Sequence, residues 1–470
     1  MREAWLKIRN ELKCPYFCAL LLIACVPIFP EYFSFFLVIA AAAFAAKDLR
    51  INKRKLRIGI IGKILMLYCG YQTISSLYSA HPLPTFSVSM MWWFFFIAYL
   101  LVVNLLTDAH RTERFLLCMT AVAGIVGLIA CVQYRINFFI GRNVDSTWLW
   151  LDNIVFKALD AFGIEIFYLD YKLRAFSTFS NPNMLAQYLV MVAPFVACYN
   201  FMKQRSDRLR LFCRTCLFLT FAGVMFSFSR GGYLAIAILA LALIILNIRH
   251  RFAAVFLYVV SAILFIPDEV INRIFSIKTG ISNSSTIANS IASTSKPNIN
   301  ASSSTATEII HKTGAESAVG ERWEIWMESI ERFLERPLFG HGAGTQNTLE
   351  IFDAIGIQAP HAHNLILQLL LEGGIVGLTL MGLIGFFVIR NSFHMMKIKN
   401  SPSIWMGFSL ILFGICFMAH GMVDYPLMVP RLILMFFVIL GIADQTIQVY
   451  AADVNSGIGK WRKRSLHGKV

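Results

Sequence analysis

Long apolar stretches dominate this chain and alternate with short polar connectors. Most stretches run for about 16 to 22 residues, which is long enough for helices to cross a hydrocarbon core of about 30 Å. We predict membrane spans at residues 16–29, 31–46, 58–79, 86–106, 115–133, 184–202, 211–227, 232–247, 252–267, 370–389, 403–424 and 430–448. The pattern therefore predicts an all-α polytopic membrane protein of about 12 transmembrane helices.

Composition supports a membrane protein. The chain is 57% hydrophobic and only 15% charged, with a mean hydropathy of +0.64, outside the usual range of soluble domains. The net charge of +15 could indicate a nucleic-acid partner, but more than half of the 42 lysines and arginines lie in alternate connectors. Cytoplasmic loops of membrane proteins usually carry more lysine and arginine than the loops on the other side. We therefore expect no nucleic acid, both termini in the cytoplasm, and location in the cytoplasmic (inner) membrane.

This topology divides the chain into four regions. Residues 1–267 form a membrane domain of nine helices with an outer loop at about 134–183, residues 268–362 form a larger outer loop, residues 363–448 supply the last three helices, and residues 449–470 form a basic tail. Within the larger loop, the Ser- and Asn-rich segment 280–318 is predicted to be disordered. Residues 319–336 repeat apolar side chains at helical spacing, which predicts a helical lid.

The outer ends of the spans carry polar residues that lipid contact alone does not explain. Arg230 lies at a hairpin between two apolar runs. Its side chain could simply extend to the membrane–water interface. Alternatively, it could bind a phosphate group, because the planar guanidinium can bind two oxygens at once. Arg322, beside the tryptophans of the lid, is either a solvated charge or a cover for a lipid-linked anion.

A second polar group precedes the span at 184–202. Asn181 and Asn183 flank Pro182, and Arg174 lies upstream. Helix capping explains these asparagines well, and contact with a ligand explains them equally. Asp424, at the outer end of a later span, either pairs with an arginine such as Arg431, caps a turn, or orients a site.

The stretch "HAHNLILQLLLEGGIVGLTL" places His363 and Asn364 directly before a long apolar run. His363 precedes Gly374 by about three helical turns, so we expect both on one helix face. A neutral imidazole there could accept a proton from a hydroxyl, or it could be a satisfied interfacial histidine. A zinc site of His341, His361 and His363 is the remaining alternative. That site lacks an evident Cys or acidic ligand, so we expect no metal and no cofactor.

Together these segments resemble the O-antigen ligase and polymerase superfamily, multi-spanning glycosyltransferases that use undecaprenyl-diphosphate-linked sugars. The resemblance covers most of residues 170 to 445. The family pattern of His, then Asn, Ser or Gln, nine residues, Gly, two residues and Gly is matched at His363, Asn364, Gly374 and Gly377. Leu378 and Thr379 reverse the Thr-Leu that often follows in the ligase branch.

Three further segments carry the resemblance. Ser229 to Gly232 looks like the family's Ser-Arg-Gly segment, with Arg230 and Leu234 fitting its Arg-xxx-Leu pattern. Residues 322–340 are similar to the segment before the catalytic helix, and Asn181-Pro-Asn183 looks like a recurrent family element.

The resemblance implies metal-independent, inverting glycan transfer at the outer face of the membrane. The donor would be an undecaprenyl-diphosphate-linked glycan, and the acceptor a hydroxyl of a glycan or lipid-linked sugar. Arg230 and Arg322 would hold the diphosphate, and His363 would position or deprotonate the hydroxyl. The remaining candidates, Arg174, Asn181, Asn183, Asn364 and Asp424, would contact substrate. We favour a polymerase over a ligase, because the Thr-Leu pair of the ligase branch is reversed here. The alternative is a transporter or lipid-linked-sugar flippase, but transporters usually place ionisable groups near the midplane.

Overall fold

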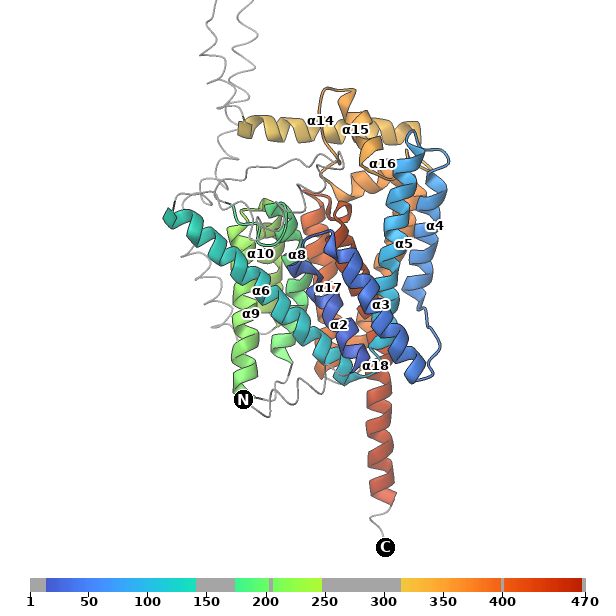
Figure 1. Cartoon of the computed structure of the whole chain (residues 1–470), viewed down its shortest axis with the longest axis vertical. Helices are drawn as coiled ribbons and strands as arrows, with labels where there is room; N and C mark the ends of the chain where they lie inside the picture. The colour runs from blue at the N-terminus through green and yellow to red at the C-terminus, as the bar shows by residue number, and fades with distance from the viewer. Residues whose placement is uncertain (1–13, 141–173, 203–205, 247–313, 399–400, 467–470) are drawn as a thin grey trace, which may run out of the picture.

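A computed structural model describes residues 14–140, 174–202, 206–246, 314–398 and 401–466. These residues form helices and no strand, so the predicted all-α fold is confirmed. Most helices have roughly aligned axes and form a bundle. One helix, α14, lies across one end of this bundle (Figure 1). The C-terminal part of the last helix extends beyond the opposite end.

The first part of the bundle contains nine helical segments. They are α2 (Pro15–Cys25), the short 3-10 helix η1 (Val26–Ile28), α3 (Phe33–Ile51), α4 (Ile60–Ser75), α5 (Pro82–Leu105), α6 (Ala109–Ile140), α8 (Pro182–Phe201), α9 (Asp207–Phe226) and α10 (Arg230–Leu246). Their first turns follow capping rules. The side chains of Asn181 and Ser206 accept backbone N–H groups at the starts of α8 and α9, and prolines occupy the first turns of α2, α5 and α8, where their missing N–H costs nothing.

The second part begins with α14 (Gly314–Glu335), which lies across the bundle, and α15 (Thr345–Asp353). It ends with α16 (Leu365–Lys397), α17 (Ser401–Gly421), the 3-10 helix η2 (Pro426–Met428) and α18 (Pro430–Leu466). The predicted disordered segment 280–318 lies outside the described residues except for 314–318, which belong to α14. That part of the prediction is wrong, because Ala and Glu there favour a helix.

Each predicted span overlaps a described helix, apart from 252–267, which lies outside the described residues. Seven described helices are long and apolar enough to cross a membrane, and two shorter apolar ones occupy Pro15–Ile28 and Arg230–Leu246. The predicted outer loop at 134–183 begins too early, because α6 continues to Ile140; residues 141–173 are outside the description.

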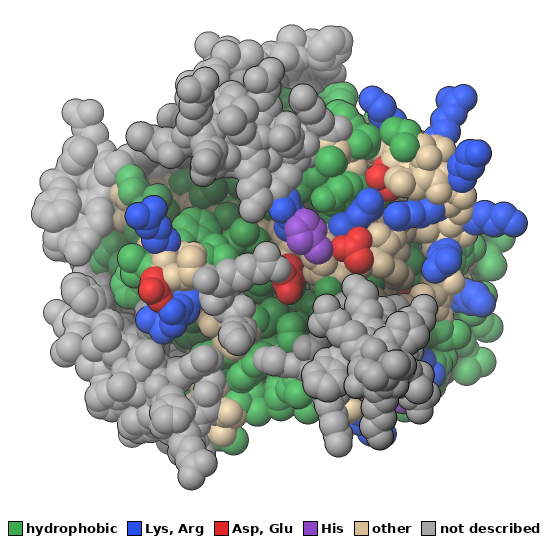
Figure 2. Space-filling model, turned by 90° about the horizontal axis from the view of Figure 1, so that it is seen from below, with side chains coloured by type: hydrophobic (Ala, Val, Ile, Leu, Met, Phe, Trp, Pro, Cys, Tyr) green, Lys and Arg blue, Asp and Glu red, His purple; other side chains and the backbone are tan. Residues whose placement is uncertain are grey.

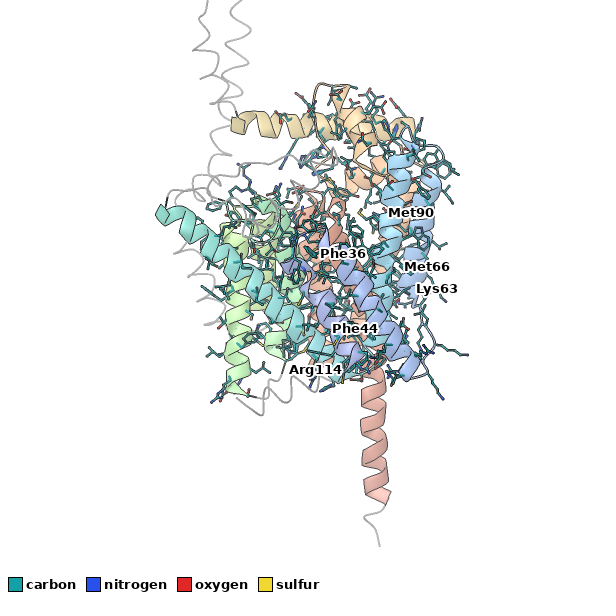
Figure 3. All side chains as sticks on the ribbon, in the orientation of Figure 1. Phe36, Phe44, Lys63, Met66, Met90 and Arg114 are labelled. Carbon is teal, nitrogen blue, oxygen red and sulfur yellow. The ribbon has the colours of Figure 1, made fainter. Side chains whose placement is uncertain are left out.

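Helices α8 and α18 form the centre of the bundle, since most of their apolar residues are buried. Small residues allow close packing around them. A Cβ atom at Gly127 of α6 would lie 2.2 Å from the carbonyl oxygen of Leu219 on α9. On the outside of the bundle, Phe36, Phe44, Met66 and Met90 are exposed along its flank (Figure 3). Such a flank is typical of a surface that faces lipid.

Basic side chains gather at the end of the bundle opposite α14. Figure 2 shows Lys and Arg side chains concentrated on one side of that face. The end of α3 and the α3–α4 connection supply exposed Lys47, Arg50, Lys53, Arg54, Lys55 and Arg57. Arg114 also lies toward this end (Figure 3). The sequence rule that assigns basic connectors to the cytoplasm would therefore place α14 on the outer side.

Helix α16 is broken at Gly374, which has φ +58° and ψ −159°. The break leaves backbone groups that the loop after α14 satisfies. His341 and Gly342 donate their N–H groups to the carbonyls of Leu371 and Glu372, at 2.8 and 2.9 Å, and Ile375 donates to the carbonyl of Pro337 at 2.8 Å. The loop is therefore fastened to α16 through backbone hydrogen bonds at the kink.

We expect Gly374→Ala to destabilise this junction strongly. Its backbone conformation is one that only glycine adopts readily, at a cost of about 1–3 kcal/mol for other residues. In addition, the new Cβ atom would lie 2.5 Å from the Leu338 carbonyl. The melting temperature of the detergent-purified protein should fall. Gly382→Ala is the matched control, because a Cβ atom at Gly382 meets nothing within 4 Å; equal melting temperatures for the two variants would contradict the prediction.

Candidate active site

Three polar side chains converge at the α14 end of the bundle. They come from the loop before α16 and from the turn after α17. His363 Nδ1 lies 3.5 Å from Asp424 Oδ1, and His361 Nε2 lies 3.8 Å from the same oxygen. The two imidazole rings meet edge to face, with centroids 4.1 Å apart. His361 and Asp424 are buried, while His363 is partly exposed.

His363 is held just outside helix α16. It adopts a left-handed backbone with φ +49°, and Asn364 follows it as the N-cap, accepting the N–H groups of Ile366 and Leu367. The Asn364 amide also donates to the carbonyl of Met422 at 3.3 Å, two residues before Asp424. Asn364 thus ties the start of α16 to the turn that carries the acid.

The expectation that His363 and Gly374 share a helix face is wrong. His363 precedes the cap, and Gly374 interrupts the helix, so helical spacing does not connect them. The glycines face another neighbour. Cβ atoms at Gly373 and Gly377 would lie 3.3 and 3.4 Å from the Tyr71 ring of α4, so this small-residue pair admits a helix, as its spacing indicates, and not the histidine.

A backbone hydrogen bond favours the neutral form of His361 with its proton on Nε2. Its Nδ1 atom accepts the backbone N–H of His363 at 3.1 Å, so the ring proton belongs on Nε2, the atom that faces Asp424. Burial, the nearby His363 and the positive charge of Arg322 lower the pKa of His361 to about 4, although Asp424 opposes this. The pKa of Asp424 is well below its usual value despite burial, because the imidazoles of His363, His361 and His420 lie beside its carboxylate.

This arrangement also bears on the zinc alternative. His341 does not join the cluster, since its Nε2 atom lies 2.7 Å from the carbonyl of Arg332. Asp424 instead completes a group of potential ligands, with its oxygen and the two imidazole nitrogens within 4.8 Å of one another. However, a neutral His361 whose Nδ1 accepts an N–H keeps its proton on Nε2 and offers no lone pair there. The residues therefore fit a hydrogen-bonded cluster better than a metal site.

The His361 environment gives stability a pH dependence. Its folded pKa of about 4 is below the 6.5 of an unperturbed histidine, so the unfolded chain binds more protons between these values. Stability should therefore fall as pH falls from about 6.5 toward 4. We expect the melting temperature to drop between pH 7 and pH 5, and to drop less in His361→Gln. Identical pH profiles for the two proteins would contradict this assignment.

Arg322 lies close to the histidine cluster. Its charge contributes to the lowered pKa of His361, and Trp326, one turn further along α14, donates its indole N–H to the carbonyl of Ala362 at 3.0 Å. Ala362 stands between the two histidines in the chain. The inward face of α14 therefore places Arg322 beside the candidate base.

Arg230 begins α10 next to the turn that carries Asp424. A Cβ atom at its neighbour Gly231 would lie 2.5 Å from a methyl carbon of Val423 and 3.3 Å from the His420 ring. The absence of a Cβ atom at residue 231 thus lets α10 approach α17 at this point. Arg230 itself is exposed. The structure accordingly brings the chain at residues 230, 322, 363 and 424 to the same end of the bundle.

Arg174, Asn181 and Asn183 form a neighbouring hydrogen-bonded group. The Arg174 guanidinium donates to the carbonyl of Ser227 at 3.0 Å and to Asn183 Oδ1 at 2.8 Å. Asn181 accepts the backbone N–H of Asn183 and caps α8. These contacts join the start of α8 to the turn before Arg230. The group therefore has a structural role. Arg431 is likewise engaged, donating to the carbonyls of Phe29 and Thr178.

A buried layer beneath the histidines was missed in the sequence. Glu372, in the apolar run of α16, accepts from Gln368 at 2.8 Å and from the hydroxyl of Tyr425 at 3.3 Å. Gln368 in turn accepts the backbone N–H of Ala362 at 2.7 Å. This layer joins the loop of the histidines to Tyr425, the residue after Asp424. An acid inside an apolar run was the available signal.

The fold and the site together define a class: a multi-spanning helical membrane protein with a histidine, acid and arginine cluster at one end of its bundle. Residues 215–382 match the family described as O-antigen ligase. The chain is also 28% identical over 124 residues to an O-antigen ligase of Pseudomonas aeruginosa, a match that covers 26% of this chain and 28% of that protein. These matches agree with the resemblance to the O-antigen ligase superfamily seen in the sequence, and the second of them spans little more than a quarter of either chain. The family match includes Arg230, Arg322 and His363.

Proposed function

We propose that the protein is an inverting glycosyltransferase that moves glycan from an undecaprenyl-diphosphate-linked donor to a sugar hydroxyl. The observation that carries the proposal is the pairing of His363 with Asp424 at 3.5 Å, beside Arg322 and the start of α10. An imidazole oriented by a carboxylate is the arrangement that enzymes use to accept a proton from an attacking hydroxyl.

The chemistry needs one displacement. With Nδ1 of His363 facing Asp424, the Nε2 atom is the ring nitrogen that receives the proton of the acceptor hydroxyl. The hydroxyl oxygen forms a bond to the anomeric carbon of the donor, and the bond from that carbon to the diphosphate breaks. Attack opposite to the leaving group inverts the configuration. Asp424 stabilises the imidazolium that results, and the lipid diphosphate leaves with the electron pair.

The arginines supply what a diphosphate leaving group requires. Negative charge grows on its oxygen as the bond breaks, and fixed guanidinium groups stabilise that charge most when water is excluded. We assign this task to Arg230 and Arg322. Arg174, Asn181 and Asn183 border the turn before Arg230 and are candidates for further contact with the substrate. Asn364 acts by holding the start of α16 against the Asp424 turn.

The enzyme would lie in the cytoplasmic membrane with both termini inside, because basic connectors gather at the end opposite α14. Its site would then face outward, where α14 covers it as a lid. A polymerase that joins repeat units is favoured over a ligase by the reversed Leu378-Thr379 pair.

The test is incubation of the purified protein with a lipid-diphosphate-linked repeat unit. Longer lipid-linked chains are expected, formed without added metal. Transfer of the intact glycan to a different terminal acceptor would indicate a ligase instead. Movement of the lipid-linked sugar across reconstituted vesicles with no new glycosidic bond would overturn the proposal in favour of a flippase.

A further inference from the structure

Helix α14 carries a row of exposed apolar side chains beside the candidate site. Trp323, Met327, Ile330 and Leu334 are 63, 50, 40 and 66% exposed. Their spacing of three and four residues places them along one side of the helix. No described part of the chain covers this row, which we call the apolar stripe.

The stripe is one of three faces of α14. At about 100° per residue, the buried side chains Ile325 and Ser329 point toward α15 and the histidine loop. The centre of the stripe lies about 150° away on one side. An acidic face of exposed glutamates is centred about 105° away on the other side, formed by Glu321, Glu324, Glu331 and Glu335. The helix is therefore packed on one face, apolar on the second and charged on the third.

The direction of the helix suits a membrane surface. α14 lies across the bundle (Figure 1), so it runs parallel to the plane of any bilayer that the bundle crosses. A helix in that orientation with one apolar and one charged free face is typical of interfacial helices, whose apolar face enters the boundary between headgroups and acyl chains.

The stripe is continuous with the side of the bundle that faces lipid. After α14 the chain continues into exposed Leu338 and Phe339. Tyr71 and Tyr78 donate their hydroxyls to the Phe339 carbonyl at 2.8 and 2.9 Å, which fixes this segment to the outer end of α4. Exposed Ile74, Leu77 and Leu83 surround that end. Apolar surface therefore extends from α4 to α14.

We propose that α14 is an interfacial helix whose apolar stripe inserts among the phospholipid acyl chains of the leaflet next to the site. The acidic face then points to water. The packed face, which carries Arg322, is held at the depth of the lipid headgroups. If the proposed function is correct, this is also the depth at which the diphosphate of a lipid-linked donor lies, so the membrane itself sets the height of Arg322 relative to its substrate.

Tryptophan quenching in proteoliposomes tests the insertion without any glycan substrate, so its outcome is independent of the proposed function. The fluorescence of Trp323 is obtained by subtracting the emission spectrum of Trp323→Phe from that of the wild-type protein. We expect this difference to be quenched by phospholipids brominated on the acyl chain close to the headgroup, and to be nearly insensitive to iodide in the water.

A matched control comes from the acidic face. In the Trp323→Phe protein, Glu324→Trp should show the opposite behaviour, with quenching by iodide and little by brominated lipid, whereas Leu334→Trp should behave like Trp323. Quenching of Trp323 by iodide alone would overturn the proposal. Protection from both quenchers would also overturn it, since it would mean that another protein segment or a second copy of the chain covers the stripe.

Discussion

Replacing His363 with alanine should lower the rate of glycan transfer by about 100-fold or more, because a positioned general base contributes about 10²- to 10⁴-fold. Of the two histidines beside Asp424, His363 is partly exposed and His361 is buried. The change therefore removes the imidazole that a substrate can reach. The measurement is the initial rate at which purified protein in proteoliposomes elongates a lipid-diphosphate-linked glycan. The loss should fall on kcat, with KM little changed.

His394→Ala is the matched control for this prediction. His394 is an exposed histidine near the other end of the same helix, α16, so its loss should leave the rate within about twofold of the wild type. Melting temperatures near that of the wild type would show that both variants are folded. Full transfer activity in folded His363→Ala would remove the proposed base and with it the mechanism.

The sequence was sufficient for the fold class because apolar length is a direct physical requirement of the membrane. Runs at 86–106 and 184–202 match α5 and α8 closely, and the run at 430–448 is the first half of α18, which continues to Leu466 through most of the predicted tail. Errors occurred where hydropathy does not decide the boundary. Helix α6 continues to Ile140 beyond its apolar core, and α14 begins within a segment whose composition suggested disorder.

The site could be predicted only in part, for a reason visible at His363. Helical spacing connected it to Gly374, but a left-handed residue before the Asn364 cap and a glycine break within α16 both interrupt that geometry. Single-residue conformations of this kind have no periodic signal. The partners of His363 are distant in sequence, so Asp424 was recognised as a candidate but its contact with the histidines was not.

Glu372 is a second residue whose contacts could not be predicted from the sequence. It was not recognised in the sequence, where it is an acid within an apolar run, because its contacts with Tyr425 and with the loop at Gly344 join segments that are remote from it in the chain. What the sequence provided was residue chemistry at the outer ends of spans. What the structure adds is that Arg230, Arg322, His363 and Asp424 belong to segments that meet at one end.

Replacing Arg230 with lysine should lower transfer by about 10- to 100-fold, although the positive charge remains. A planar guanidinium can donate two parallel hydrogen bonds to phosphate oxygens, whereas an ammonium acts as a point charge. Losing one charge-assisted contact of about 1.5–3 kcal/mol gives this range. The rate of glycan elongation is the measurement, and a donor with a better leaving group than the lipid diphosphate should be affected less.

Arg208→Lys provides the control for guanidinium loss in general. Arg208 is an exposed arginine in the first turn of α9, the helix that precedes Arg230, but it lies at the end of the bundle away from the histidines. Its substitution should leave the rate unchanged. Because Arg230 is exposed and lysine keeps the positive charge, Arg230→Lys should fold normally. Complete glycan assembly by Arg230→Lys would therefore show that this arginine does not hold the diphosphate, and the leaving-group charge would have to be stabilised elsewhere.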